Sequence, residues 1–394
     1  MPEHRISGRS IYLLMLVLAF VAIASDLNAT GPDVEPYRLD AVHSVQSADF
    51  SPDGHFLALG VTQSGKLGAD TTFSNSVAIW DLNSKKIVAN TPFGSGKWQP
   101  LCEARFLHYM PDGRRLAVLA DDAITVFDPM SRGEISRIDL GLGPFDPTAE
   151  RSPSPWVVDM KVAPVGNKVA VLITYLHNYK SAQLRVYDVG TKLVTWEWNF
   201  QEDVNGYSFE FSPDATKIAV AMPYPRRGVG LVVLDIDSSR EVFRLPTRQE
   251  DPTARAIFAT NTELLTVPVW EDNHTRRGSV KFWDLTTGKV TRQISASPAG
   301  IHYYIDMTMD RRHLLGYIGT EKTVEYFSDP VDERFQIWDL RSGNVIATSG
   351  DIPRSNKSDP LQMRLSPDGR WVVAYVPGLG AMAEVFELPT ASAP

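Results

Sequence analysis

The sequence contains a single cysteine, Cys102, among its 394 residues. One cysteine cannot form an intramolecular disulfide, and it cannot supply a CxxC or Cys₂His₂ zinc site. Because an unpaired cysteine usually packs inside a protein, Cys102 is predicted to be a small buried apolar residue. The eight histidines have no metal-ligand spacing such as HxH or HExxH. The sequence therefore predicts no metal site and no cofactor.

Runs of basic residues are also lacking, and the net charge is −8. Binding to a phosphate backbone needs a basic patch, so a nucleic-acid partner is not expected. The sequence has neither a GxSxG nucleophile motif nor a glycine-rich phosphate loop. No catalytic residue is therefore assigned from the sequence.

One long hydrophobic run is present, at 11–24 (IYLLMLVLAFVAIA). Its 14 residues fall short of the roughly 20 that a transmembrane helix needs, and they match the core of a signal peptide. Arg5 and Arg9 precede the run, and Ala22-Ile23-Ala24 provides small residues for cleavage before Ser25. The N-terminus is therefore predicted to direct export.

The predicted division of the chain is a signal peptide at 1–24, a linker at 25–34 and a folded domain at 35–394. The alternative is a retained membrane anchor formed by residues 11–24, and Leu27-Asn28-Ala29 is a second cleavage candidate. Under either reading the folded domain is expected in the periplasm or outside the cell. Export without disulfides fits a bacterial periplasm better than a eukaryotic secretory route.

Seven short apolar segments end on an acidic residue, at intervals of 47 to 60 residues. They are Ile79-Trp80-Asp81, Val126-Phe127-Asp128, Val186-Tyr187-Asp188, Val233-Leu234-Asp235, Phe282-Trp283-Asp284, Ile337-Trp338-Asp339 and Val385-Phe386-Glu387. A turn motif precedes each segment. Its clear copies are Ser51-Pro52-Asp53-Gly54, Met110-Pro111-Asp112-Gly113, Ser212-Pro213-Asp214-Ala215 and Ser366-Pro367-Asp368-Gly369. Regular spacing of both motifs indicates an internal repeat.

Each motif has a local structural reason. In Pro-Asp-Gly, the proline sets φ, the aspartate bonds its own backbone and the glycine adopts positive φ. The acidic residue that ends each apolar segment begins a second turn, as in Asp284-Leu285-Thr286-Thr287-Gly288. The segments between turns are rich in β-branched and aromatic residues. The repeat unit is therefore predicted to be four strands, a to d, joined by an a–b turn, a variable b–c loop and a c–d turn.

This pattern resembles the WD-repeat family of β-propellers, in a divergent bacterial form. The resemblance implies an all-β fold with seven four-stranded blades in a closed ring. The Gly-His dipeptide that usually precedes strand a in this family is absent here. Without its His–Asp network, the blades are expected to depend on aromatic side chains packed between them. These are Trp80, Phe127, Tyr187, Trp283, Trp338 and Phe386.

The last repeat unit lacks a fourth strand, because the chain ends as EVFEL followed by PTASAP. An open blade would expose a sheet edge, which proteins avoid. The segment Glu35–Asp40 is a β-like stretch with no place in any repeat unit. It is predicted to pair with Ala383–Leu388 and close the ring, with Pro36 tolerated on an outer edge strand.

The b–c and d–a loops form one face of the ring, and these loops are expected to be long and irregular. The segments 63–75 and 319–334 are two of its predicted loops. Such loops on a rigid scaffold commonly carry binding residues. The candidate binding residues on this face are Trp98, Phe145, Trp156, Arg226, Arg227, Trp270, His302, Tyr303, Tyr326 and Phe327. Aromatic and arginine side chains are frequent interface anchors.

A second candidate site is a charged girdle in the central channel. It consists of the residue before the apolar anchor of each strand a: Asp49, Arg105, Lys161, Glu210, Asp306 and Arg364, with Ile257 at the seventh position. Alternation along the strands predicts that these side chains point into the channel. They are expected either to pair with one another or to bind a small polar ligand.

The leading prediction for function is an exported protein-binding or scaffolding module that acts through its loop-rich face. The alternatives are a propeller enzyme, such as a hydrolase, a lactonase or a quinone-dependent oxidoreductase, and a glycan-binding module. An enzyme would need convergent acidic, Asn and His groups at the channel mouth, and the predicted girdle contains neither His nor Asn.

Overall fold

The computed structural model of the chain describes most of the ring. The described residues are 33–34, 36–39, 44–67, 70–97, 106–120, 122–142, 155–175, 182–200, 208–221, 229–246, 253–268, 279–294, 302–324, 327–350, 352, 361–377 and 383–389. They form only strands and their connections, and none of them belongs to a helix that could cross a membrane.

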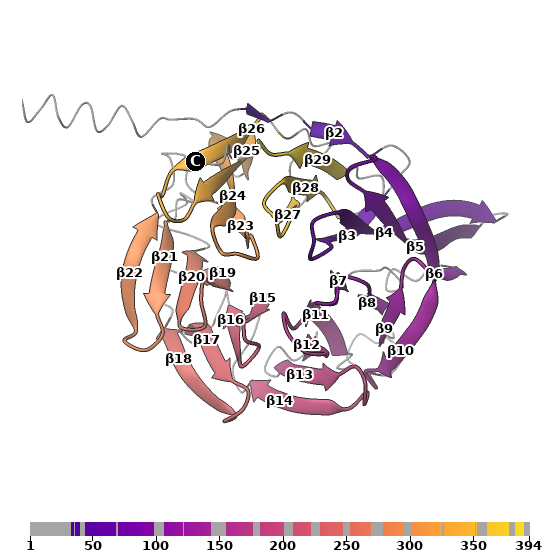
Figure 1. Ribbon diagram of the computed structural model, residues 1–394, viewed down its shortest axis with the longest axis horizontal. Coiled ribbons are helices and arrows are strands. Elements are labelled where there is room, and N and C mark those ends of the chain that lie inside the picture. The colour runs from indigo at the N-terminus through magenta and orange to yellow at the C-terminus, as the bar shows by residue number, and fades with distance from the viewer. Residues whose placement is uncertain are drawn as a thin grey trace, which may run out of the picture.

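Seven antiparallel blades surround a central axis, as predicted (Figure 1). Blade 1 is β3 (Val45–Phe50), β4 (Phe56–Leu67), β5 (Asp70–Asp81) and β6 (Lys86–Lys97). Blade 2 is β7 (Phe106–Tyr109), β8 (Leu116–Ala120), β9 (Ala123–Asp128) and β10 (Gly133–Asp139). Blade 3 is β11 (Pro155–Val162), β12 (Lys168–Tyr175), β13 (Ala182–Asp188) and β14 (Val194–Phe200).

Blade 4 is β15 (Ser208–Phe211), β16 (Lys217–Ala221), β17 (Val229–Asp235) and β18 (Arg240–Pro246). Blade 5 is β19 (Thr253–Phe258), β20 (Glu263–Pro268), β21 (Val280–Asp284) and β22 (Lys289–Ile294). Blade 6 is β23 (His302–Met307), β24 (His313–Val324), β25 (Phe327–Asp339) and β26 (Val345–Ser349). Blade 7 takes β27 (Gln362–Leu365), β28 (Trp371–Tyr375) and β29 (Ala383–Glu387) from the C-terminus.

An N-terminal strand completes blade 7, which confirms the predicted closure. Strand β2 (Pro36–Arg38) pairs antiparallel with β29, with Tyr37 opposite Val385. A second N-terminal strand, β1 (Asp33–Val34), pairs in parallel with β26 on the outer edge of blade 6. It begins two residues before the expected start of the folded domain at 35. The N-terminal segment therefore joins two neighbouring blades, and not only the last one.

Local hydrogen bonds at the a–b turns take the place of the missing His–Asp network. In blade 1, the Ser51 hydroxyl donates to Asp53 and accepts from the Phe56 amide at 2.9 Å. The same arrangement recurs in blades 4, 6 and 7, where the hydroxyl belongs to Ser212, Thr308 and Ser366. Each clasp ties the start of strand b to the end of strand a, so short side chains fix these turns.

The core is divided into seven clusters, each between two adjacent blades. In every blade the residue before the acidic end of strand c packs against the preceding blade. Trp80 lies with Trp371 of blade 7, and Phe127 lies with Ile79 of blade 1. Tyr187, Trp283, Trp338 and Phe386 do the same in their blades, which confirms the predicted packing between blades.

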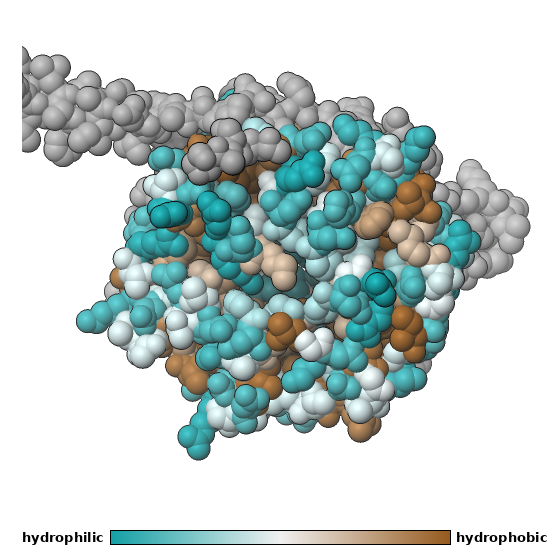
Figure 2. Space-filling model, viewed as in Figure 1, coloured by the Kyte–Doolittle hydropathy of each residue, from teal (hydrophilic) through white to brown (hydrophobic). Residues whose placement is uncertain are grey.

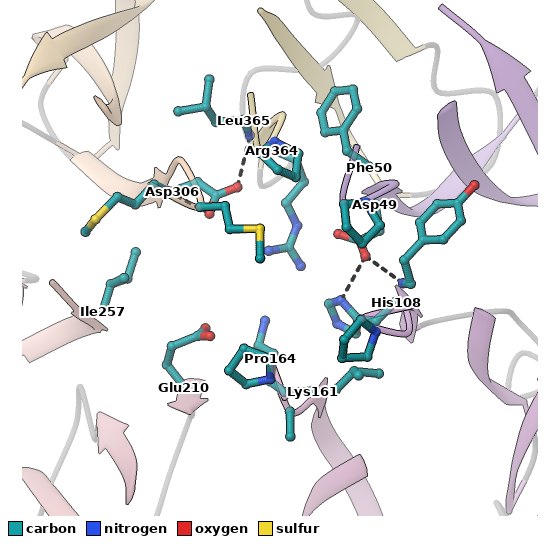
Figure 3. Close-up of a pocket in the computed structure, with 18 of the residues that line it drawn as sticks. Asp49, Phe50, His108, Lys161, Pro164, Glu210, Ile257, Asp306, Arg364 and Leu365 are labelled. Carbon is teal, nitrogen blue, oxygen red and sulfur yellow. Dashed lines mark hydrogen bonds and ion pairs between the residues drawn. The ribbon is translucent and has the colours of Figure 1, made fainter. Parts of the chain in front are cut away.

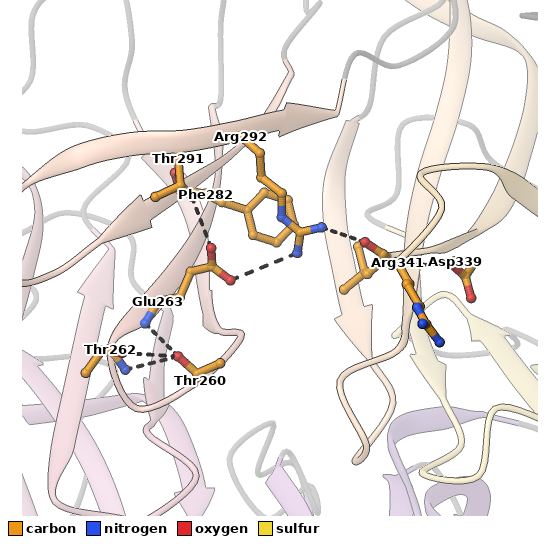
Figure 4. A network of polar contacts seen from close by, with 9 residues as sticks. Thr260, Thr262, Glu263, Phe282, Thr291, Arg292, Asp339 and Arg341 are labelled. Carbon is orange, nitrogen blue, oxygen red and sulfur yellow. Dashed lines mark hydrogen bonds and ion pairs between the residues drawn. The ribbon is translucent and has the colours of Figure 1, made fainter.

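Polar contacts at the outer rim also join neighbouring blades. Arg292 on β22 stacks over the Phe282 ring at 3.7 Å and donates to the Leu340 carbonyl of blade 6 (Figure 4). Glu263 lies 4.0 Å from the guanidinium and accepts a hydrogen bond from Thr291. The arginine therefore links the outer strand of one blade to the c–d turn of the next.

The segments 63–75 and 319–334 are not irregular loops, contrary to the prediction. Strands β4 and β5 pair without interruption from Phe56↔Asp81 to Leu67↔Asp70, and this hairpin extends beyond the ring (Figure 1). Strands β24 and β25 pair out to Val324↔Phe327. The first ribbon is rich in Ser, Thr and Gly, and the second is rich in charged residues. Both lack the apolar alternation that marks a half-buried strand.

Candidate functional site

The central channel contains two cavities. The first, the turn-side cavity, has a volume of about 240 Å³ and lies at the end of the channel where the a–b turns are. Its wall includes the turn prolines Pro52, Pro111, Pro164 and Pro367. The second, of about 560 Å³, lies toward the beginning of the inner strands. His108, Lys161 and Arg364 line both cavities, so the girdle separates the two. Side chains of mixed hydropathy surround the centre of the ring on the face seen in Figure 2.

The girdle positions converge on the first cavity. Asp49, Lys161, Glu210, Asp306 and Arg364 line it together with Ile257 (Figure 3). Arg105 lies outside the described residues. In blade 2 the position that Asp49 occupies in blade 1 is filled by His108, because each lies three residues before the proline of the a–b turn.

The sequence prediction for blade 2 was therefore wrong in phase by three residues. It aligned strand a on Phe106, since β7 reads Phe-Leu-His-Tyr and several of these residues could serve as the apolar anchor. Alignment on Pro111 would have identified His108. The girdle thus contains a histidine, contrary to the sequence prediction.

Asp49 contacts two residues of blade 2. Its Oδ2 accepts the Tyr109 amide at 2.8 Å and lies 3.5 Å from Nδ1 of His108. Burial by itself would raise the pKa of Asp49. The contact with His108, the charge of Arg364 and the Tyr109 amide outweigh burial and hold that pKa below its ordinary value. Asp49 is therefore an anion that joins blades 1 and 2.

Two more aspartates join inner strands in the same way. Asp306 Oδ2 accepts the Leu365 amide of blade 7 at 2.9 Å. Asp159 accepts the Phe209 amide of blade 4 at 3.4 Å. In each pair the carboxylate belongs to one blade and the amide to the next blade along the chain. These carboxylates satisfy amides along the channel wall and so have a structural role.

No such bond to the backbone of a neighbouring blade is described for Arg364, Lys161 or Glu210. Burial disfavours the charge of Arg364, but the carboxylates of Asp306 and Asp49 raise its pKa above the ordinary value. Its guanidinium donates no hydrogen bond to a described residue. The Lys161 side chain is 13% exposed, and its described ion pair is a 3.9 Å contact with Asp159. Glu210 lines the cavity without a described hydrogen bond.

The loop-face candidates are mostly beyond what the structure describes. Trp98, Phe145, Arg226, Arg227, Trp270 and Tyr326 lie outside the described residues. Trp156 is in β11 opposite Thr174, His302 is in β23 opposite Tyr317, Tyr303 follows it in β23, and Phe327 is in β25 opposite Val324. The structure describes the backbone of these four residues, and none of them occupies a girdle position in its strand.

The side chains that line the turn-side cavity are suited to binding charged groups of a ligand. Its wall holds three acidic residues, Asp49, Glu210 and Asp306, and three basic residues, Lys161, Arg311 and Arg364. Among the described residues, no Ser, Cys or Thr lines it, so the His108–Asp49 pair has no aliphatic hydroxyl or thiol there to activate. Within the described part of the chain, no group of His, Cys, Asp or Glu has the arrangement of a metal site.

Known proteins support the fold. No family model matches the sequence, and no curated protein matches it. U3-55K has a TM-score of 0.59 at 12% identity, covering 90% of this chain and 98% of that one. The hydrazine synthase of Kuenenia stuttgartiensis has a TM-score of 0.54 at 16% identity, covering 88% and 95%. The C-terminal WD40 domain of Sif2 has a TM-score of 0.50 at 11% identity, covering 91% and 100%.

At such low identity these neighbours share the fold alone. Each is covered almost completely, so the similarity extends around the whole ring and is not confined to a few blades. The chain therefore has the WD-repeat-like propeller architecture that its repeated motifs predict.

Proposed function

We propose that the chain is an exported protein-binding module, a divergent bacterial relative of WD-repeat propellers, and that its partner docks on the face from which two hairpins project. The fold is consistent with a protein-interaction role, since WD40 domains are among its neighbours. The observation that carries the proposal is the extension of β4–β5 and β24–β25 beyond their blades.

These hairpins offer backbone groups for pairing. Strand β3 pairs with β4 only as far as Val61, so among the described strands Gln63–Leu67 has a partner on the β5 side alone. The ribbon of Thr320–Val324 with Phe327–Val331 has no third strand among the described ones. Exposed edges of this kind accept an extended segment of another protein as an added strand. The two hairpins belong to blades 1 and 6, on either side of blade 7.

Export agrees with where the ring begins. Cleavage before Ser25, or after Ala29, leaves β1 and β2 in the mature chain, so the ring can close after processing. N-terminal sequencing of the protein from the envelope fraction tests this. We expect a mature end at Ser25 or just after Ala29, and recovery of intact chain from the cytoplasm would contradict export.

Shortening one hairpin tests the docking face. Blade 2 shows that the ring accepts a two-residue b–c turn, because Ala120 pairs with Ala123. Replacing residues 64–73 with Asn-Gly should give blade 1 the same form and leave Tm nearly unchanged. Cross-linking in the envelope fraction should then capture a partner with the original chain and not with the shortened one.

A matched control keeps that test specific. A chain that lacks residues 390–394 alters the C-terminus and neither hairpin, so it should capture the partner as well as the original chain does. Equal capture by the hairpin-shortened chain, with Tm unchanged, would overturn this docking face.

A further inference from the structure

We propose that the turn-side cavity of the central channel binds a small zwitterion, a molecule of amino-acid size that carries a carboxylate, an ammonium group and an aliphatic chain. Its carboxylate would meet Arg364 and Lys161, and its ammonium would meet Glu210. This site is separate from the hairpin edges and does not depend on them.

Unequal use of the charged groups is the first observation. Asp49 and Asp306 accept backbone amides from the next blade, so their lone pairs are partly occupied. Arg364 carries five N–H donors, and none has a described hydrogen-bond acceptor. Glu210 accepts no described hydrogen bond. Polar groups that line a cavity and lack partners mark a place where a ligand or ordered water completes the bonding.

Convergence of these groups is the second observation. The Arg364 guanidinium, the Lys161 ammonium and the Glu210 carboxylate extend from three different blades toward the same central space (Figure 3). No ion pair within 4.0 Å joins Glu210 to either cation among the described contacts. The space between them therefore separates two cations from the Glu210 carboxylate. A molecule with one charge of each sign can contact both sides at once.

The balance of charge selects against a simple ion. Three acidic and three basic residues line the cavity, so a net anion is repelled by Asp49 and Asp306 and a net cation by Arg364 and Lys161. A zwitterion has no net charge, and each of its groups finds its complement. Charge-assisted hydrogen bonds of this kind are stronger than neutral ones.

Size and the apolar wall specify the remainder of the ligand. The cavity of about 240 Å³ is smaller than the pockets of roughly 300–1,000 Å³ that hold drug-sized molecules. Ile257, Met307 and Met309 form an apolar wall, and Ile257 lies across the space from His108 (Figure 3). An aliphatic side chain can bury its surface there. Leucine and methionine have the required features.

Binding of L-leucine to the chain of residues 25–394 tests the proposal by calorimetry. Two analogues each lack one charge: 4-methylpentanoate has no ammonium and 3-methylbutylamine has no carboxylate. We expect leucine to bind at least about tenfold more tightly than either analogue, the effect of losing one charge-assisted hydrogen bond. If an analogue bound as tightly as leucine, the cavity would recognise a single charge, and the proposal of a zwitterion site would be overturned. No binding of leucine or methionine at millimolar concentration would also overturn it.

Two substitutions assign the ends of the ligand. Glu210→Gln should weaken leucine binding about tenfold and leave 4-methylpentanoate binding unchanged, because that analogue has no ammonium. Arg364→Gln should weaken the binding of both leucine and 4-methylpentanoate. If Arg364→Gln does not fold, Lys161→Gln takes its place in this test. Lys289→Gln, on the exposed outer strand β22, is the matched control and should bind as the original chain does. Equal weakening of both ligands by Glu210→Gln would contradict the assignment.

Discussion

At the scale of single residues, the a–b turns show how a motif visible in sequence acquires a further role in the ring. Gly54 has a φ of +71°, which confirms the positive φ expected of the glycine in Pro-Asp-Gly. A Cβ at this position would lie 2.6 Å from Cγ of Asp368, in the equivalent turn of blade 7. The sequence predicts the first property, whereas the second depends on the approach of two turns that are 314 positions apart in the chain.

We therefore expect Gly54→Ala to destabilise the protein through two effects. Left-handed backbone costs a non-glycine residue about 1–2 kcal/mol. The Cβ also displaces the Asp368 carboxylate, which accepts hydrogen bonds from Ser366 Oγ at 2.6 Å and from the Arg370 amide at 3.1 Å. Overpacking of this kind typically costs about 1–3 kcal/mol more. Urea denaturation measures the total.

A second glycine separates these effects. Gly343 has a φ of +76°, and nothing lies within 4 Å of the Cβ that alanine would add. Gly343→Ala should therefore lose only the backbone contribution and be the less damaging substitution. Equal losses for the two variants would show that the Asp368 contact has no energetic effect.

At the scale of elements, the N-terminal segment is the part on which ring closure depends. Strand β2 supplies the outer strand of blade 7, and Leu39, just after it, is 5% exposed in the cluster between blades 7 and 1. Strand β1 adds a parallel contact with β26. Without this segment β29 keeps β28 as its one partner strand and presents an unpaired edge, which favours aggregation.

Removal of residues 33–39 should therefore lower Tm sharply or prevent folding, whereas removal of residues 390–394 should change Tm little. Leu39→Ala is the milder test, because it keeps β1 and β2 and leaves a cavity that costs about 2–5 kcal/mol. Thermal unfolding followed by circular dichroism measures all three. If the chain without 33–39 unfolded at the original Tm, the ring would not need this closure.

The elements also show which parts of the fold the sequence can reveal. The closing strand was predictable because the phase of seven repeats left one strand missing and Glu35–Asp40 unassigned. The hairpins were not, because their ribbons lack the alternation of apolar and polar residues by which a half-buried strand is recognised in a sequence. His108 was missed because the apolar pattern of β7 has no unique register. Pro111, in the turn that follows β7, provides the register, since turn geometry is less variable than strand composition.

At the scale of the whole molecule, the seven clusters make stability a property of neighbouring pairs. Each cluster joins two blades, so each blade contributes to two clusters and the closed ring leaves no terminal blade. The inner strands repeat this arrangement with carboxylate–amide bonds, and the outer strands with contacts such as that of Arg292 with Leu340. Sequence motifs predicted the hydrophobic part of this design, whereas the polar links require residues from different repeats to be placed side by side.

The turn face also carries many carboxylates that favour the folded state when charged. Aspartates at the c–d turns accept backbone amides, and the pKa values of Asp128, Asp188, Asp235, Asp284 and Asp339 lie below the ordinary value. For Asp128 and Asp339 the largest cause is the amide bond from Ser131 and Ser342, respectively. In the unfolded chain these carboxylates return to a pKa of about 3.9.

This difference determines how stability depends on pH. Because the folded pKa is the lower one, the unfolded chain binds more protons near pH 4, and the free energy of unfolding falls as pH falls. The contribution is complete above about pH 5 and is lost as pH passes below about 3.9 and then through the folded values. We expect Tm to fall through this range, as measured by thermal unfolding at a series of pH values.

Substitution by asparagine tests the origin of that pH dependence. In Asp128→Asn/Asp188→Asn/Asp339→Asn, each amide oxygen can still accept the turn amides, such as that of Thr191 at 2.7 Å, but it carries no charge and does not titrate. The triple variant should be less stable than the original chain at pH 7 and approach it near pH 3, so its curve is flatter. Asp237→Asn removes an exposed carboxylate that accepts no described hydrogen bond, and it should keep the original slope. Parallel curves for the triple variant and the original chain would show that the turn carboxylates do not cause the acid sensitivity.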